Sequence, residues 1–116
     1  IGSSEAYLGK EKRAIQQVRH YIEEHFAENV TLNRLAQYVS FSPYYHLRAF
    51  QAEIGIPPYA YLESVRIRHT QRLIKAGIPL AEVAAEVGFS SQSHMTRQFK
   101  KIIGVTPGQY AQIIRY

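Results

Sequence analysis

The stretches FSPYYHLRAF, at residues 41–50, and FSSQSHMTRQF, at residues 89–99, are two versions of one phrase. Both begin with Phe-Ser, place a His five residues after the first Phe, and end on a second Phe. Flanking residues also match, at an offset of 48 at first and of 49 after one extra residue enters the second copy. This many matches with a single shift indicate a duplicated unit. The matching pairs are Leu32 and Leu80, Ala36 and Ala84, Val39 and Val87, His46 and His94, Arg48 and Arg97, Phe50 and Phe99, Gly55 and Gly104, Pro58 and Pro107, and Tyr61 and Tyr110.

Each copy has the residue spacing of a helix-turn-helix. In the first copy Ala36 lies in the middle of a short helix, and Ser40, four positions later, begins the turn. Ala84 and Gly88 take these places in the second copy. The small Ala lets the next helix cross closely, and Gly tolerates the positive φ that such turns often need. Ser40 therefore predicts a first turn that is either slightly strained or differently shaped. A plain helical hairpin is the alternative for either copy alone.

Apolar residues recur at helical spacing along almost the whole chain, which predicts an all-α fold. Thr31, Ser42 and Thr106 stand where a hydroxyl would cap a helix, and Pro follows the last two of them. We expect seven helices, over about 10–27, 32–39, 42–55, 58–76, 80–87, 91–103 and from 106 on. Their expected core stripes are Ile15, Val18, Ile22 and Phe26 in the first, Leu32, Leu35, Ala36 and Val39 in the second, and Leu80, Val83, Ala84 and Val87 in the fifth.

Composition limits the class of protein. With 116 residues, 46% of them hydrophobic, the chain can form one small domain or two very small ones that share a core. No apolar run approaches the ~20 residues of a membrane helix, so we expect a soluble protein. The absence of Cys fits a reducing cytoplasm. The start, IGSSEAYLGK, has no Met and no signal peptide, so we expect residues 1–9 to be a tag-like, flexible leader on a piece of a longer protein.

The positive charge is concentrated in the second half of the chain. Of the net charge of +5, residues from Arg66 onward contribute eight Lys and Arg against two Glu, whereas the earlier residues carry six against seven. A basic half favours a polyanionic partner, although many small basic domains bind nothing charged.

The connecting helix expected over residues 58–76 sets a distance between the two copies. At ~1.5 Å per residue it is about 28 Å long, and successive major grooves on one side of B-DNA lie about 34 Å apart. One chain could therefore place two reading helices in adjacent major grooves. A helical solenoid is disfavoured because such arrays need at least three repeats.

The chain closely resembles the DNA-binding domain of the AraC/XylS family of bacterial transcription regulators. The resemblance covers about residues 16–116 and is carried by LAQYVSFSPYYHLRAFQAEIGIPPYAYL, RIRHTQRLI and, most specifically, EVGFSSQSHMTRQFKK followed by G.TPGQY. It implies an all-α, homeodomain-like fold of seven helices, with helix-turn-helix subdomains at 10–57 and 78–116 joined by a linker helix at 58–77. Two positions depart from the family pattern: His46 stands where an apolar residue is usual, and Thr70 replaces the customary linker Ala.

The resemblance also implies a function. Members bind promoter DNA sequence-specifically in the bacterial cytoplasm, at the nucleoid, and usually activate transcription. It implies RNA polymerase as a partner, an N-terminal effector-binding or dimerisation domain in the full-length protein, and no cofactor.

The second reading helix should turn Met95, Phe99 and Ile102 toward the core. The opposite face then presents base-contact candidates: Gln92, Ser93, Thr96 and Arg97. Arg97 is the strongest candidate because its planar guanidinium can pair with guanine O6 and N7. The alternative for Arg97 is a phosphate or a Glu partner.

In the first reading helix Phe50 and Ile54 should point inward. Tyr44, Leu47, Arg48 and Gln51 are then the base-contact candidates. Leu47 would suit a thymine methyl group, or it is a core residue in a shifted register. The expected phosphate contacts are Arg34, Lys100, Lys101 and Thr106, and the linker residues Arg66, Arg68 and Arg72 are more often structural.

Other functions fit less well. An enzyme is disfavoured because the chain has no Cys, no Asp and no G-x-S-x-G motif. His46 and His94 recur at equivalent places, but without a close ligand pair a packed or capping role is favoured over a metal site. A protein-only adaptor is the remaining alternative, and RNA binding is disfavoured because A-form grooves exclude helices.

Overall fold

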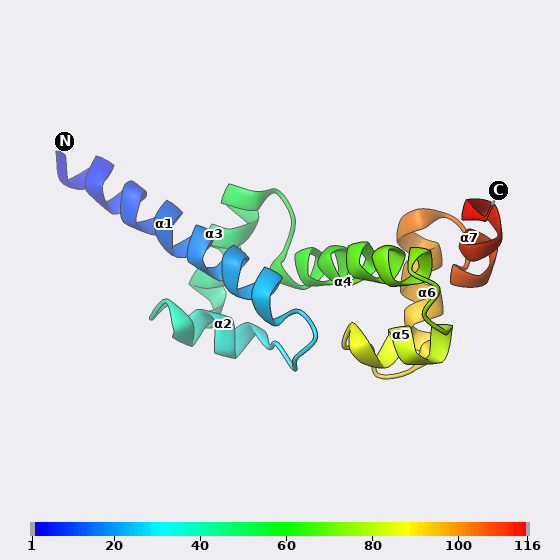
Figure 1. The fold of residues 1–116 in the computed structure, drawn as a ribbon. Helices are drawn as coiled ribbons and strands as arrows, with labels where there is room; N and C mark the ends of the chain where they lie inside the picture. The colour runs from blue at the N-terminus through cyan, green and yellow to red at the C-terminus, as the bar shows by residue number, and fades with distance from the viewer. Residues whose placement is uncertain (1, 116) are drawn as a thin grey trace. The chain divides into compact units, whose positions relative to one another are not determined.

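The computed structural model describes residues 2–115, with side chains from residue 7 on, and these residues form seven helices (Figure 1). The all-α prediction is confirmed. Within this range, residues 2–9 of the expected leader are helical, because the first helix begins at Gly2 rather than near Lys10 and ends at His25. The helices are α1 (Gly2–His25), α2 (Leu32–Tyr38), α3 (Pro43–Ile54), α4 (Pro58–Lys75), α5 (Leu80–Glu86), α6 (Gln92–Ile103) and α7 (Pro107–Ile114).

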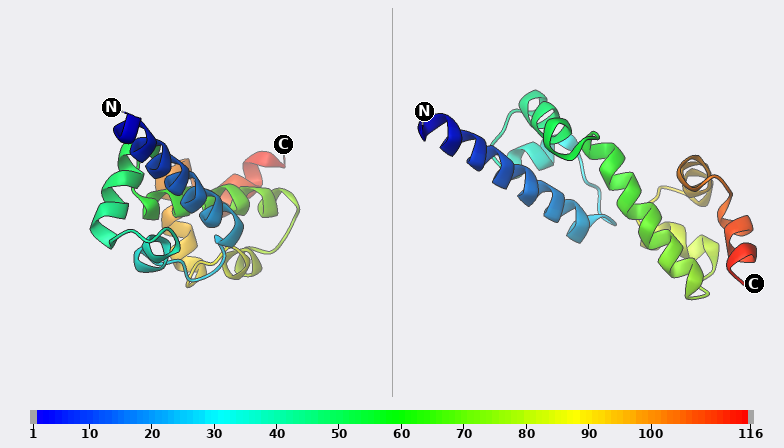
Figure 2. Two further views of the ribbon diagram at one scale, coloured as in Figure 1. Left: turned by 90° about the vertical axis from the view of Figure 1, so that its left-hand side faces the viewer. Right: turned by 90° about the horizontal axis from the view of Figure 1, so that it is seen from above.

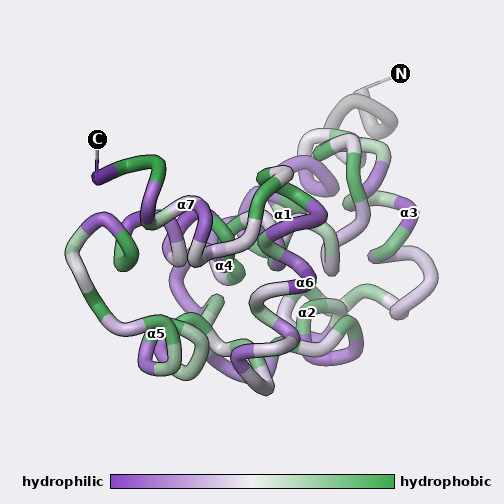
Figure 3. The backbone as a smooth tube through the Cα atoms, turned by 90° about the vertical axis from the view of Figure 1, so that its right-hand side faces the viewer, coloured by the Kyte–Doolittle hydropathy of each residue, from purple (hydrophilic) through white to green (hydrophobic). Residues whose placement is uncertain are grey.

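The chain divides into two compact units. Unit 1 comprises the residues up to 25 together with residues 30–62, and unit 2 comprises residues 26–29 and the residues from 63 on. Helix α4 is therefore shared: its first turns belong to unit 1 and the rest to unit 2. Hydrophobic and hydrophilic residues are interspersed along the helices, as the hydropathy colouring of Figure 3 shows. At helical spacing this pattern lets each unit bury one face of a helix.

In unit 1, helices α1 and α2 both pack on α3. The predicted stripe of α1 is confirmed over Ile15, Val18 and Ile22, which are fully buried, as is Phe50 of α3. The stripe of α2 is only half correct. Leu35 and Ala36 are buried, but Leu32 is 37% exposed and Val39 is half-buried. Leu32 is the first residue of α2 and lies at the rim of the core rather than in it.

In unit 2, helix α6 packs on α5 and α7, and Figures 1 and 2 show α5 and α6 gathered beside the C-terminal half of α4. The expected core residues Met95 and Phe99 are fully buried, but Ile102 is 44% exposed. Ile103 packs against the core instead, together with residues of α7, so the inward face of α6 turns toward α7 in its last turn. The buried core comprises Ile67, Ile74, Val83, Ala84, Val87, Phe89, Met95 and Phe99.

The segment after α1 belongs to unit 2, so Phe26 does not continue the α1 stripe as predicted. Its ring stacks on His69 with 4.0 Å between ring centroids. Arg66 is buried and donates from Nε to the Phe26 carbonyl at 2.7 Å and from Nη2 to the Glu28 carbonyl at 3.0 Å. The linker arginine thus has the expected structural role. Thr70, also buried, donates its hydroxyl to the Arg66 carbonyl at 2.8 Å, so its extra polar group is satisfied.

Both tight turns pass through the left-handed region at the same position. Ser40 has φ 59° and Gly88 has φ 88°, both in the left-handed region. Of the two possibilities for Ser40, the strained turn is therefore the one observed, because a side chain at positive φ costs about 1–2 kcal/mol. Gly88 has a second reason to be Gly: a Cβ atom there would lie 2.8 Å from the carbonyl oxygen of Ala27.

None of the helices formed by the described residues is both long and apolar enough to cross a membrane.

Candidate nucleic-acid interface

Serine caps fix the register of α3 and α6. Ser42 Oγ accepts from the Tyr45 amide at 3.2 Å, and Ser91 Oγ accepts from the His94 amide at 3.0 Å. Both helices are 12 residues long and end at a Gly in the left-handed region, Gly55 and Gly104. Because Ser42 corresponds to Ser91, the offset is 49 along the whole of both helices. The extra residue of the second copy lies in the turn, before the cap.

This register corrects the predicted match of His46 with His94, because His46 corresponds to Met95. Both His46 and Met95 are fully buried. Neither ring nitrogen of His46 has a hydrogen-bond partner, and burial lowers the pKa of His46. His94 is half-buried and places Nδ1 3.2 Å from Ser90 Oγ. Among the described residues, no group of three or more potential metal ligands lies together.

The exposed face of α3 carries three of its four base-contact candidates. Tyr44 is 69% exposed, and Arg48 and Gln51 are exposed as well. The structure brings two of them together, with the Arg48 guanidinium carbon 5.8 Å from the centre of the Tyr44 ring. Such a contact limits the freedom of both side chains. Phe50 is fully buried on the opposite side, as predicted.

Leu47 lies between its two predicted environments. It is half-buried and forms part of the wall of an apolar cleft of about 220 Å³ in unit 1. Its side chain is therefore neither in the core nor fully on the open face that Tyr44 and Arg48 share. The cleft is lined by Val30, Thr31, Leu32, Leu35, Leu47, Pro57, Pro58, Tyr59 and Leu62.

The exposed face of α6 is polar and basic. Gln92, Ser93 and Arg97 are exposed and Thr96 is half-buried, whereas Met95 and Phe99 on the other side are fully buried. Ser93 and Arg97 are four residues apart, so their side chains are neighbours on one helix face. Lys100 and Lys101 extend the exposed basic face through the last turn. The helix therefore presents hydrogen-bonding groups to solvent on one face, while its opposite face is packed in the core.

Two further phosphate candidates lie at helix starts. Arg34 is exposed in the first turn of α2, where its amide donates to Thr31 Oγ1 at 3.1 Å. Thr106 is half-buried and caps α7: its Oγ1 accepts from the Gln109 amide at 3.1 Å, and Gln109 Oε1 accepts from the Thr106 amide at 2.9 Å. This capping box gives Thr106 a structural role in addition to any contact with phosphate.

The sequence did not single out Tyr45, whose hydroxyl donates to Glu11 Oε1 at 2.8 Å. This bond joins the first turn of α3 to α1. Residues 34 positions apart that share a hydrogen bond leave no periodic signal, so nothing in the sequence indicated the pair.

Two helix-turn-helix units, each with an exposed polar helix face, define the class of DNA-binding transcription regulator domains. Comparison with known families agrees: a helix-turn-helix domain model matches residues 35–113. The chain belongs to the AraC-type family of helix-turn-helix regulators.

Relatives and solved structures support this assignment. The chain is 43% identical over 81 residues to YbfI of Bacillus subtilis, an uncharacterized HTH-type transcriptional regulator, with 70% of this chain and 30% of that protein covered. It is 32% identical over 109 residues to the HTH-type regulator SACOL0084 of Staphylococcus aureus, with 93% and 14% covered. The chain thus spans less than a third of the length of these relatives.

Two solved domains have the same fold. The C-terminal domain of AraT, a response regulator from Geobacillus stearothermophilus, superposes with a TM-score of 0.83 at 31% identity, covering 86% of this chain and 84% of that one. The DNA-binding domain of AdpA, a global transcriptional factor solved in complex with a target DNA, gives a TM-score of 0.83 at 26% identity, covering 87% and 92%.

Proposed function

We propose that this regulator domain recognises its promoter site with two reading helices, α3 and α6, each placed in a separate major groove. The observation that carries this is the matched exposure of the two helices: each is serine-capped, 12 residues long, buried on one side and polar on the other. Helices of this kind insert their N-terminal residues into the major groove. The AdpA domain, which has the same fold, was solved with DNA.

Base reading is assigned to the exposed residues near the start and middle of each helix. Arg48 and Arg97 correspond at the offset of 49 and are both exposed, so each is the guanine-reading candidate of its helix. Lys100, Lys101, Arg34 and Thr106 are the candidates for positioning on phosphate. The remaining proposed base contacts are Tyr44, Leu47 and Gln51 on α3 and Gln92, Ser93 and Thr96 on α6.

The connecting helix sets the proposed spacing. Helix α4 has 18 residues, which gives a length of about 27 Å, and adjacent major grooves on one side of B-DNA are about 34 Å apart. Subdomains at 10–57 and 78–116 with a connector at 58–77 would then read two blocks of one site as a monomer.

The proposal also includes a further domain in the longer protein and a protein partner at the promoter. The relatives extend well beyond the matched region, which supports an effector-binding or dimerisation domain elsewhere in a longer cytoplasmic regulator. RNA polymerase is the proposed protein partner at the promoter.

Selection of random duplexes by the domain tests the proposal. Two short conserved base blocks, about one helical turn apart, are the expected result. Affinity for the selected duplex should also fall steeply with rising salt, because bound cations on the DNA compete with the protein. Recovery of no preferred sequence, with affinity insensitive to salt, would instead indicate a protein-only adaptor.

A further inference from the structure

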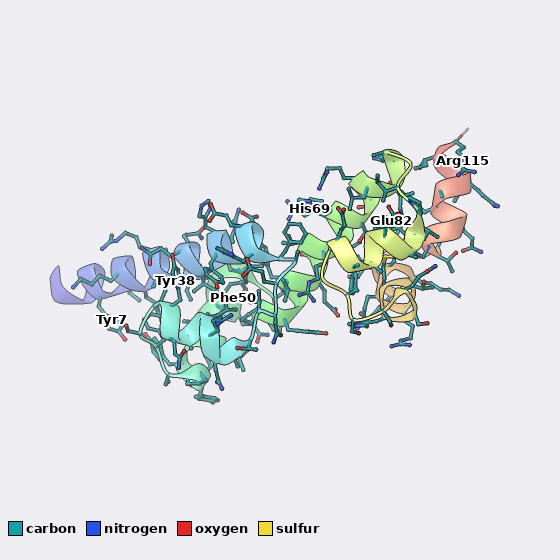
Figure 4. All side chains as sticks on the ribbon, turned by 60° about the horizontal axis from the view of Figure 1, so that its bottom comes forward. Tyr7, Tyr38, Phe50, His69, Glu82 and Arg115 are labelled. Atoms are coloured by element: carbon teal, nitrogen blue, oxygen red, sulfur yellow. The ribbon has the colours of Figure 1, made fainter. Side chains whose placement is uncertain are left out.

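A chain of three side chains links α1 to the start of α3. Tyr45 Oη donates to Glu11 Oε1 at 2.8 Å, and the Tyr7 hydroxyl lies 2.6 Å from the Tyr45 hydroxyl. The single hydroxyl proton of Tyr45 goes to Glu11, so Tyr7 is the donor in the second bond. Tyr7 and Glu11 are one helical turn apart and share a face of α1. Figure 4 shows Tyr7 projecting from α1 on the side of α2 and α3.

Tyr45 lies next to the proposed base-reading residues of α3. Tyr45 lies in the first turn, directly after the exposed Tyr44 and three residues before Arg48. Its amide is bonded to the Ser42 cap at 3.2 Å, and its ring meets Phe41 edge-on with 5.0 Å between centroids. Movement of Tyr45 would therefore move the turn that presents Tyr44 and Arg48.

Helix α6 secures its first turn in another way. His94 corresponds to Tyr45 at the offset of 49, and its Nδ1 lies 3.2 Å from Ser90 Oγ. Ser90 is the extra residue of the second turn. A side chain of that turn therefore contacts the first turn of α6 directly. The first turn is one residue shorter and has no equivalent of Ser90. In unit 1 the anchor comes from α1.

The Tyr45 hydroxyl stays protonated and can donate its hydrogen bond throughout the working pH range. The contacts of its hydroxyl with Tyr7 and with the Glu11 carboxylate raise the pKa of Tyr45 above its ordinary value of 10.0. The phenol therefore keeps its proton at every pH at which such a domain works.

We propose that Tyr45, Glu11 and Tyr7 are positioning residues for DNA reading: their hydrogen-bond chain sets the pose of the first turn of α3 and so tunes which bases unit 1 prefers. This inference rests on the proposed function of α3. Tyr7 and Glu11 lie outside residues 35–113, the part matched by the family model.

The test measures base preference in each block separately. Dissociation constants are determined for the selected duplex and for duplexes with single base changes, and Arg48→Ala identifies the block that α3 reads. Glu11→Ala, which removes one hydrogen bond, should weaken binding about fivefold. Tyr45→Phe, which removes both bonds of the chain, should weaken it at least as much. They should also flatten preferences in the α3 block while leaving those of the α6 block intact. Glu11→Gln, which keeps an acceptor oxygen, should restore most of the preference.

Tyr61→Phe is the matched control. Tyr61 Oη donates to Glu23 Oε1 at 2.6 Å, which is the same chemistry between another helix and α1 in the same unit, but Tyr61 lies on α4 and not on α3. This variant should lose thermal stability to a similar extent and keep the base preferences of both blocks.

Equal effects of Tyr45→Phe and Tyr61→Phe on base preference, or no effect of Tyr45→Phe, would overturn the inference while the proposed function stands. A wild-type domain that selects no sequence would overturn the proposed function and the inference together.

Discussion

The two helix-turn-helix units have the same fold but differ in the residues at two equivalent positions, one in the turn and one in the core. Unit 2 has Gly88 at the left-handed turn position and Met95 in the core, whereas unit 1 has Ser40 at φ 59° and a buried His46 whose ring nitrogens have no partner. Unit 1 therefore carries a backbone strain and a desolvation cost that unit 2 avoids. Caps and core shape therefore preserve the duplicated fold, while single positions can adjust the stability of each copy.

The largest expected effect tests what the units have in common. Phe50 and Phe99 are both fully buried, and each meets a Tyr ring edge-on, at 5.9 Å and 5.3 Å between centroids. Phe50→Ala and Phe99→Ala should each lower the free energy of unfolding by about 3–5 kcal/mol through the cavity left behind. Urea denaturation followed by circular dichroism measures the loss, and amide exchange shows which unit opens. A urea unfolding curve unchanged by either variant would refute the helix register.

The next effect concerns the turn of unit 2. Gly88→Ser places in the second turn the residue type of the first, and should cost more than about 2 kcal/mol of stability. The left-handed strain accounts for about 1–2 kcal/mol, and the new Cβ would also meet the Ala27 carbonyl at 2.8 Å. Chemical denaturation measures the change. A variant as stable as the wild type would mean that the loop at Ala27 moves freely.

Exchanging the core residues tests the cost of His46. His46→Met should stabilise the domain by about 1–2 kcal/mol, because buried polar groups without partners cost about 1–3 kcal/mol. The reciprocal Met95→His should destabilise it by a similar amount. Thermal and urea unfolding at neutral pH compare the two, and a stability loss in His46→Met would show that the imidazole has a favourable role.

The same variant should change the dependence of stability on pH. Burial lowers the pKa of folded His46 below 6.5, so below about pH 6.5 the unfolded chain takes up a proton that the folded chain does not. Stability therefore falls as the pH drops from about 6.5 toward the folded pKa. His46→Met should remove this part of the loss and leave the part due to His69, whose pKa is also lowered, first by burial. An identical pH profile for the variant would contradict the assignment.

The smallest effect is relief of the first turn. Ser40→Gly should stabilise the domain by about 0.5 kcal/mol, since the strain removed exceeds the added entropy of an unfolded Gly. Precise urea titrations can resolve the shift. Destabilisation would indicate that the Ser40 side chain contributes more than its φ angle costs.

Much of the fold could be predicted from sequence because its determinants are local. The caps at Thr31, Ser42 and Thr106 and the positive φ at Gly88 follow from residue chemistry, and the structure confirms each. The reach of the core was harder to predict. Helical periodicity predicted that Ile102 would face the core, but it cannot show where a neighbouring helix lies. In the structure the core continues toward α7, so Ile103 is packed and Ile102 is exposed.

The register error has a different cause. Aligning identical letters paired His46 with His94, but adjacent hydroxyls at Ser90 and Ser91 left the true cap ambiguous. Only the hydrogen bond from the His94 amide to Ser91 Oγ fixes it. The candidate reading faces could be predicted in outline, since Arg48 and Arg97 are exposed as expected. The Tyr7–Tyr45–Glu11 chain could not, because it depends on the packing of α1 against α3.

The most direct measurement compares Arg48→Ala with Arg97→Ala on the selected duplex and on its single-base variants. Each change should abolish discrimination of about 1–3 kcal/mol at one base position, and the two positions should lie in different blocks about one helical turn apart. Uniform weakening on every duplex by both variants would mean that neither arginine reads a base. Loss of preference in one shared block would contradict the central claim that the chain carries two independent readers.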